Sequence, residues 1–210
     1  MLHALEALVI PFLEGLYASV GYAGVVVAMT IESCLIPLPS ELILPLAGWS
    51  VARGVPEPIT GAAWDFWPAV LAGVIGNTAG SLLAYGIGRA GGRPLLARYG
   101  RYVLISSHDI ALADRWFARY GDATVFFTRM LPVVRTFISL PAGIARMTLW
   151  RFLLFSALGA IPWTIALVFA GKTLGDNWRQ VREALAGLDF LIAAVILLLI
   201  GLFVWRHLRA

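Results

Sequence analysis

Residues 31–41 of this chain read IESCLIPLPSE, and residues 127–143 read FTRMLPVVRTFISLPAG. Prolines interrupt an apolar run in both stretches, which predicts that a helix entering the membrane there turns back before crossing it. The leading proline and the closing glycine are eleven positions apart in both cases, Pro37 with Gly48 and Pro132 with Gly143. Paired, proline-interrupted apolar segments in two halves of a chain point to the binding site of a transporter.

Each interrupted stretch also carries two charges beside the break. The first pair is acidic, Glu32 and Glu41, and the second is basic, Arg129 and Arg135. A charged side chain at bilayer depth costs about 2.5–3.5 kcal/mol on insertion scales, so such residues persist where they face a protein interior, a water-filled cavity or a charged ligand. These four side chains are therefore the candidate substrate-binding residues.

The composition is that of a membrane protein. The 210 residues are 60% hydrophobic with a mean hydropathy of +0.84, and only 13% are charged, about half the share in a soluble domain. The net charge of +4 comes almost wholly from arginine, with Lys172 the only lysine. These arginines flank apolar segments, so nucleic-acid binding is not expected. The single Cys34 excludes an intrachain disulfide.

Hydrophobic patterning predicts an all-α polytopic membrane protein, with two re-entrant helical hairpins and spanning helices arranged as an inverted repeat. A membrane domain over residues 20–172 lies between an N-terminal amphipathic helix, 1–19, and a loop with a C-terminal spanning helix, 173–210. Within that domain the expected order is hairpin 20–52, span 66–88, connector 89–119, hairpin 120–147 and span 149–171.

Small residues and prolines mark the expected turns and close helix contacts. Small side chains spaced along the 66–88 span favour a closely packed central helix, and Asn77 on it is expected to form an interhelical hydrogen bond. The residues assigned to turns or close packing are Pro37, Pro39, Gly48, Gly76, Gly80, Pro132, Pro141 and Gly143.

The distribution of arginine predicts the orientation. The 89–119 connector holds six arginines, whereas residues 1–65 hold only Arg53. By the positive-inside rule, the connector and the C-terminus are expected in the cytoplasm. The loop at 172–187 argues the other way, because it should lie outside and yet carries Lys172, Arg179 and Arg182.

The four charged residues suit proton-linked movement of an anion. Guanidinium groups bind phosphate through a planar fork and stay charged when desolvated, so Arg129 and Arg135 can converge on one phosphate. A desolvated carboxylate at Glu32 or Glu41 can exchange a proton near neutral pH. In a purely structural alternative, the glutamates only pair with the arginines and hold the hairpins together. Both hold if a ligand competes for the pairs.

Enzyme chemistry is not expected. The three histidines, His3, His108 and His207, lie outside the predicted spans, so a histidine-based catalytic site is not expected. A His/Cys metal site has no candidates beyond Cys34, which is expected to be a small apolar filler. No catalytic residue, metal or cofactor is predicted.

Three segments together resemble the DedA family, bacterial relatives of eukaryotic membrane proteins with a VTT domain. The first is 32–41 with Ala47 and Gly48, the second is 76–89, with Tyr85, Gly88 and Arg89, and the third is 127–143. They occur in the expected order and cover roughly residues 20–172.

The resemblance implies a lipid transporter of the bacterial cytoplasmic membrane that moves polyprenyl phosphate or phospholipid, with proton motive force involved in some members. It places Glu32 and Glu41 on the family's functional acidic positions, and Arg129 and Arg135 on its functional arginines. Some members carry an aspartate in a longer proline loop, where this chain has Glu41.

Two other functions stay open at this point. One is a proton-coupled transporter of small ions or cationic compounds, with the two glutamates as carriers. The other is a non-transporting assembly factor with structural charges. A flippase needs a lateral opening to lipid, whereas a small-ion carrier needs only a closed aqueous path. The expected partners are membrane lipid and protons, and a homo-oligomer is compatible with the sequence.

Overall fold

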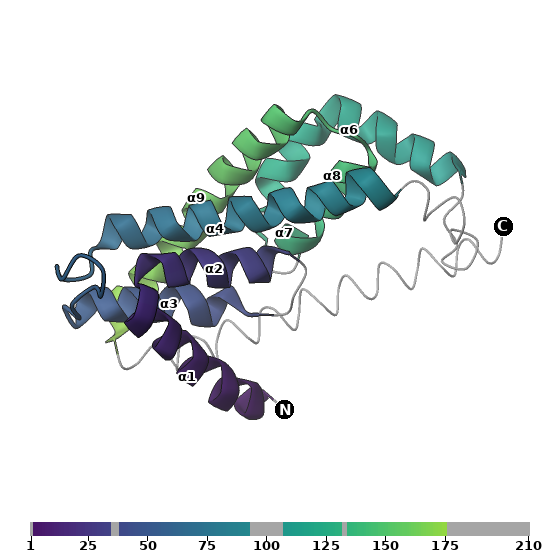
Figure 1. Cartoon of the computed structure of the whole chain (residues 1–210). Coiled ribbons are helices and arrows are strands. Elements are labelled where there is room, and N and C mark those ends of the chain that lie inside the picture. Colours follow the sequence, from purple (N-terminus) through teal and green to yellow (C-terminus); the bar gives the residue numbers. More distant parts are fainter. Residues whose placement is uncertain (1, 35–37, 93–106, 132–133, 176–210) are drawn as a thin grey trace.

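The computed structural model describes residues 2–34, 38–92, 107–131 and 134–175, and its secondary-structure elements there are all helices (Figure 1). This confirms the predicted all-α class. Pro37, Pro132, the middle of the expected connector and the C-terminal span lie outside the described residues. In chain order the elements are α1 (Leu2–Val20), α2 (Tyr22–Ser33), α3 (Ser40–Ala52), α4 (Phe66–Ile87), the π-helical turn η1 (Gly88–Gly92), α6 (Ser107–Thr128), α7 (Val134–Phe137), α8 (Ser139–Ile144) and α9 (Leu149–Leu174).

Among the described residues, two helices are long and apolar enough to cross a membrane. They are α4 with η1, 27 residues, and α9, 26 residues. The side chain of Asp65 caps α4 by accepting a hydrogen bond from the Trp67 N–H at 3.0 Å. Both spans expose large apolar side chains, as lipid-facing helices do: Leu71, Ile75, Leu82, Leu83 and Ile87 on α4, and Leu154, Leu158, Ile161 and Phe169 on α9.

Each interrupted stretch is divided into helical arms, and the arms of the first stretch are short. Helices α2 and α3 have 12 and 13 residues, about 18–20 Å at 1.5 Å per residue, against a hydrocarbon core of about 30 Å. Pro39 has the extended backbone that precedes a helix, and α3 begins at Ser40. The second stretch differs, because α6 begins at Ser107, inside the segment predicted as a connector. No proline lies between Ser107 and Thr128, and α6 is continuous over these 22 residues.

The arms pack on both spans in a crossed pattern. In each half the first arm contacts the span of its own half, α2 against α4 and α6 against α9. The second arms exchange partners, so that α3 packs on α9 and α8 packs on α4 and η1. Figure 1 shows α2 and α3 alongside α4, with α8 near its other end. The spans also contact each other, which ties the halves into one bundle.

The exchanged arms meet the spans backbone to backbone. A Cβ atom on Gly48 of α3 would overlap the Val168 carbonyl oxygen of α9 and lie 2.8 Å from the Lys172 nitrogen. A Cβ on Gly143 of α8 would likewise overlap the Tyr85 carbonyl oxygen of α4 and lie 2.9 Å from the Arg89 nitrogen. Only glycine permits this approach. The spans also have glycines at these contacts. Gly171 lies against the backbone of Pro45, and Gly88 lies against the backbone of Leu140.

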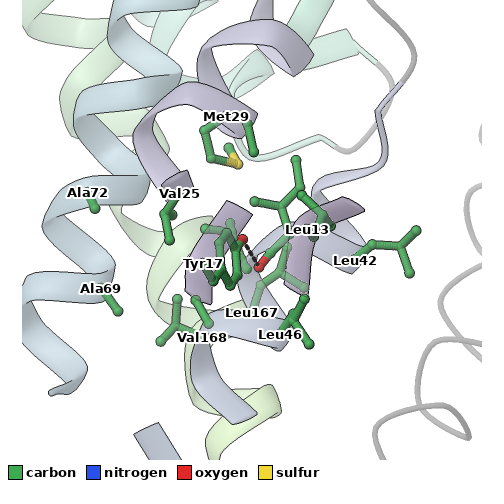
Figure 2. Close-up of a cluster of buried hydrophobic side chains, with 14 of the residues drawn as sticks. Leu13, Tyr17, Val25, Met29, Leu42, Leu46, Ala69, Ala72, Leu167 and Val168 are labelled. Atoms are coloured by element: carbon green, nitrogen blue, oxygen red, sulfur yellow. Dashed lines mark hydrogen bonds between the residues drawn. The ribbon is translucent and has the colours of Figure 1, made fainter. Parts of the chain in front are cut away.

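The larger apolar cluster lies where α1, α2, α3, α4 and α9 meet (Figure 2). Tyr17 of α1 stands in it, and its hydroxyl donates to the Ile43 carbonyl of α3 at 2.9 Å. A buried tyrosine needs such a partner, and this one fixes α1 against α3. The other side chains labelled in Figure 2 are Leu13, Val25, Met29, Leu42, Leu46, Ala69, Ala72, Leu167 and Val168.

A smaller apolar cluster lies at the other end of the spans. It is formed by Tyr85, Val125, Ile138, Ala142, Met147 and Phe152. Along α4, Asn77 lies between Ala72 of the larger cluster and Tyr85 of the smaller one. Along α9, Ser156 lies between Phe152 and Leu167 in the same way. Buried polar side chains therefore occupy the middle of both spans, with apolar packing on either side.

The loop between α3 and α4 is tied to the start of α2 by a buried glutamate. The Glu57 carboxylate accepts hydrogen bonds from the Thr60 N–H at 2.7 Å, the Thr60 hydroxyl at 2.8 Å and the Ile59 N–H at 3.2 Å. The carboxylate also lies against Gly21, which has a φ of +56° that favours glycine. A Cβ atom at this position would overlap the Glu57 carboxylate. Desolvation raises the pKa of Glu57, but these hydrogen bonds, with that from the Tyr22 N–H, lower it below its ordinary value.

Glu57 should therefore make the stability of the fold depend on pH. Because its pKa is lower in the folded chain, its contribution is fully present above the unfolded value and is lost as pH falls through the folded value. We expect the melting temperature of the wild type to fall further than that of Glu57→Gln between about pH 7 and about pH 3. Parallel pH profiles would contradict this. Asp65→Asn, a change at an exposed cap, is the matched control.

Candidate functional site

The segments beside the two proline breaks are in direct contact through one buried ion pair. Arg135 of α7 donates from Nη2 to Glu32 Oε1 of α2 at 2.6 Å, and their side chains are 3% and 7% exposed. Glu32 also accepts from the Ser33 hydroxyl at 2.7 Å and from the Thr136 hydroxyl at 3.3 Å. The Glu32 carboxylate therefore has two hydroxyl donors in addition to Arg135. This hydrogen-bonded ion pair joins the two halves of the chain.

The other predicted acid, Glu41, stands beside this pair. Nη2 of Arg135 also donates to the Ser40 hydroxyl at the first turn of α3, and that hydroxyl donates to Glu41 Oε1 at 3.2 Å. Ser40 is fully buried, whereas Glu41 is half-buried. Glu32 is thus the acid that contacts Arg135 directly, and Glu41 is linked to the same guanidinium through one hydroxyl.

Arg129 lies at the end of α6, and neutral acceptors bind it. Nη1 donates to the Asn77 side-chain oxygen of α4 at 3.1 Å. Nη2 donates to the Ser139 hydroxyl of α8 at 2.8 Å and to the Ser156 hydroxyl of α9 at 3.3 Å. The residue is only 1% exposed. A buried cation held by an amide and two hydroxyls keeps its positive charge uncompensated by these partners, which suits binding of an anion.

Three buried N–H donors around these arginines lack an acceptor among the described residues. They are Nε of Arg129, Nε of Arg135 and the indole Nε1 of Trp163. A buried donor without an acceptor costs about 1–3 kcal/mol, so such groups mark places where a ligand can contribute. All three are donors and none accepts, which matches the oxygen atoms of an anion.

Aromatic rings flank both guanidinium groups. The Cζ atom of Arg135 lies 5.5 Å from the centre of the Trp163 ring, and that of Arg129 lies 6.0 Å from the centre of the Phe152 ring. Both rings come from α9. Cation–π attraction at these distances stabilises a desolvated guanidinium, so α9 orients both arginines from one side.

We use the name arginine site for this set of side chains: Glu32, Ser40, Asn77, Arg129, Arg135, Ser139, Ser156 and Trp163. Of the predicted substrate-binding residues, Glu32, Arg129 and Arg135 lie within it and Glu41 borders it. The expected interhelical hydrogen bond of Asn77 is present, and its partner is Arg129.

Sequence reasoning missed the other members of the site. Ser40 and Ser139 lie inside the two quoted stretches, but serine is common at helix starts and carries little signal there. Ser156 is a polar residue within an apolar span, a pattern that suggests an interhelical partner. Trp163 follows a proline in the middle of that span, away from the membrane boundaries where tryptophan is expected. That position was its signal.

A second series of polar contacts lies at the η1 end of α4. The Tyr85 hydroxyl donates to the Met147 carbonyl at 2.5 Å, and Arg89 donates to the Tyr85 oxygen at 2.9 Å. The next residue before Met147 is Arg146, which has a φ of +54°. These contacts join the start of η1 to the turn between α8 and α9.

Comparison with known proteins identifies the family. The family model of the VTT domain matches residues 58–173, more than half of the chain. The chain is also 43% identical to undecaprenyl phosphate transporter A of Bacillus subtilis (strain 168) over 169 residues, 80% of this chain and 79% of that protein. The chain belongs to the DedA family of VTT-domain membrane proteins.

Other DedA-like relatives carry more than one kind of name. Undecaprenyl phosphate transporter A of Staphylococcus aureus (strain NCTC 8325 / PS 47) is 29% identical over 191 residues, 89% of this chain and 90% of that protein. An alkaline phosphatase-like protein of Lactococcus lactis subsp. cremoris (strain MG1363) is 33% identical over 192 residues, 88% and 86% of the two chains. No solved structure matches the chain.

The chemistry of the arginine site is that of charge recognition. Within the described ranges, no group of three or more His, Cys, Asp or Glu side chains is placed to hold a metal ion. The site offers two guanidinium groups, a titratable carboxylate and an indole N–H in the middle of an apolar bundle. The DedA family, to which this membrane protein belongs, includes relatives named as transporters.

Proposed function

We propose that this DedA protein moves a phosphate-headed polyprenyl lipid of the undecaprenyl phosphate type across the bacterial cytoplasmic membrane. The observation that carries the proposal is Arg129, a buried guanidinium whose side-chain hydrogen-bond acceptors in the described structure are all neutral. A phosphate compensates that charge and receives its hydrogen bonds. Two relatives named undecaprenyl phosphate transporter A support this choice of lipid.

The architecture proposed for this movement is an inverted repeat of two re-entrant hairpins. Short arms support it, because α2 and α3 cannot reach across a bilayer. The paired backbone contacts of Gly48 with α9 and Gly143 with α4 support a two-fold relation. A further pair has the same character: Gly76 of α4 lies against Val26 of α2, and Gly159 of α9 lies against Phe126 of α6. The arginine site then lies near the bilayer midplane, reached alternately from each face.

Proton coupling is assigned to Glu32. When the lipid phosphate draws Arg135 toward itself, the carboxylate loses the partner that holds it ionised and takes up a proton from water. Phosphate binding and proton uptake are then linked through one ion pair, and release of the lipid reverses both. Glu41, which is linked to the Arg135 guanidinium through Ser40, is the second carboxylate of the proposed coupling site.

The alternative functions are less well supported. A carrier of cations needs a carboxylate that is available to the cation, whereas Glu32 is engaged by Arg135. In the purely structural alternative, both arginines are counter-ions. The Glu32–Arg135 pair fits that reading, whereas Arg129 donates its side-chain hydrogen bonds to neutral groups and interacts with Glu32 only through space.

Transport in reconstituted liposomes tests the proposal. We expect the purified protein to accelerate the flipping of labelled undecaprenyl phosphate but not of undecaprenol, which lacks the phosphate, and an imposed proton gradient to change the rate. Equal flipping of both lipids would reject phosphate recognition, and no flipping of either would favour the assembly factor.

Glu32→Gln mimics the protonated carboxylate, so it should bind the lipid phosphate and lose the response to the gradient. An unchanged gradient response in Glu32→Gln would remove that residue as the coupling site.

A further inference from the structure

One face of α9 lies against both arginines of the site, with Gly159 beside Arg129 and Trp163 beside Arg135. Gly159 on this helix leaves room for Arg129, because a Cβ there would lie 2.7 Å from the Arg129 Cβ. Trp163 follows one helical turn later, on the same face, and its ring faces Arg135. The stripe Ser156–Gly159–Trp163 thus runs along both guanidinium groups.

The indole N–H of Trp163 has no structural task among the described residues. Its Nε1 atom is buried without an acceptor, although buried tryptophan usually pairs this group. The same holds for Nε of Arg129 and Nε of Arg135, so three neighbouring residues each present one unused donor. An indole N–H can only donate. It therefore favours an ionised oxygen and offers nothing to a cation.

We infer that Trp163 is a headgroup ligand of this transporter, whose indole N–H donates to the phosphate oxygen while its ring orients Arg135. The inference rests on the proposed function and adds a residue to it that selects for an ionised phosphate. Ring and N–H have separate roles: cation–π attraction holds the guanidinium in place before the lipid arrives, and the N–H binds only when the phosphate is present.

The conservative substitution Trp163→Phe separates the two roles. Phenylalanine keeps an aromatic face for Arg135 and lacks the N–H. We expect Trp163→Phe to bind undecaprenyl phosphate about tenfold more weakly, as for one hydrogen bond to a charged acceptor. Trp163→Leu, which loses the ring as well, should bind still more weakly. Undecaprenol should bind the wild type and Trp163→Phe equally. The matched control is Trp150→Phe on the same helix, where the side chain is exposed.

A second measurement observes the N–H directly in the wild-type protein. With 15N-labelled tryptophan, the indole resonance that is lost in Trp163→Phe should move when undecaprenyl phosphate is added and stay in place with undecaprenol. A purely structural tryptophan would not distinguish the two lipids. Wild-type affinity in Trp163→Phe, or an indole signal that ignores the phosphate, overturns the inference and leaves the proposed function standing. If the wild type itself does not discriminate between the two lipids, the proposed function fails, and the inference fails with it.

Discussion

Arg129→Lys is expected to reduce flipping of undecaprenyl phosphate by at least about tenfold, even though the positive charge is kept. The guanidinium of Arg129 reaches acceptors on three helices, Asn77 on α4, Ser139 on α8 and Ser156 on α9. An ammonium group is a single point and cannot hold all three and a phosphate as well. Loss of one hydrogen bond to a charged group is worth about 1.5–3 kcal/mol, and about 1.4 kcal/mol is a factor of ten.

The control for Arg129→Lys is Arg119→Lys. Arg119 belongs to the same helix α6 and is exposed beside Tyr120, so its replacement should leave flipping unchanged. Both variants are compared after equal insertion and equal thermal stability have been verified. Wild-type flipping in a well-folded Arg129→Lys variant would show that charge alone is needed and would remove the planar fork from the proposal.

Gly143→Ala and Gly48→Ala are expected to destabilise the fold by about 1–3 kcal/mol each, the usual range for overpacking. In both variants the new methyl group meets a backbone carbonyl, that of Tyr85 or that of Val168, and backbone cannot move aside as a flexible side chain can. Because the two environments are alike, the two losses should be of similar size. Unfolding in mild detergent with increasing denaturant measures them.

Gly86→Ala is the matched control for these glycine substitutions. Gly86 lies in α4 near the same crossing, but its Cβ position has no atom within 4 Å. Alanine is the better helix former by about 1 kcal/mol, so this variant should be as stable as the wild type or more so. Destabilisation by all three substitutions alike would mean that the close approach at Gly48 and Gly143 is not what requires glycine.

Much of the fold could be predicted from the apolar composition and from the positions of the prolines. Apolar runs long enough to cross a membrane predicted the regions of α4 and α9. The prolines predicted that a helix ends between α2 and α3 and again between α6 and α7. The packing of α3 on α9 and of α8 on α4 could not be predicted from the sequence. It depends on which face of each spanning helix exposes its backbone at a glycine. The start of α6 at Ser107 was also missed, since arginines interleaved with apolar residues suit both a surface connector and the first turns of a longer helix.

The charged part of the site was predictable because charge in an apolar segment demands an explanation. Glu32 and Arg135 are 103 positions apart in the chain, and their complementary signs were the signal that they could meet. Asn77 was expected to form an interhelical hydrogen bond, but nothing identified Arg129 as its partner, and the two serines carried no signal of this kind. The structural alternative paired both glutamates with the arginines, whereas in the structure Arg135 pairs with Glu32 and Arg129 donates to neutral side chains.

The glycine crossings also bear on how the bundle can move. At Gly48 and at Gly143 a hydrogen atom, not an interlocked side chain, separates one helix from the next. A helix can roll about such a contact without changing any rotamer, whereas interdigitated leucines would have to unlock together. The two crossings lie toward opposite ends of the spans, with the arginine site between them. These two contacts would let α3 and α8 tilt against the spans, as the alternating access proposed for the arginine site requires.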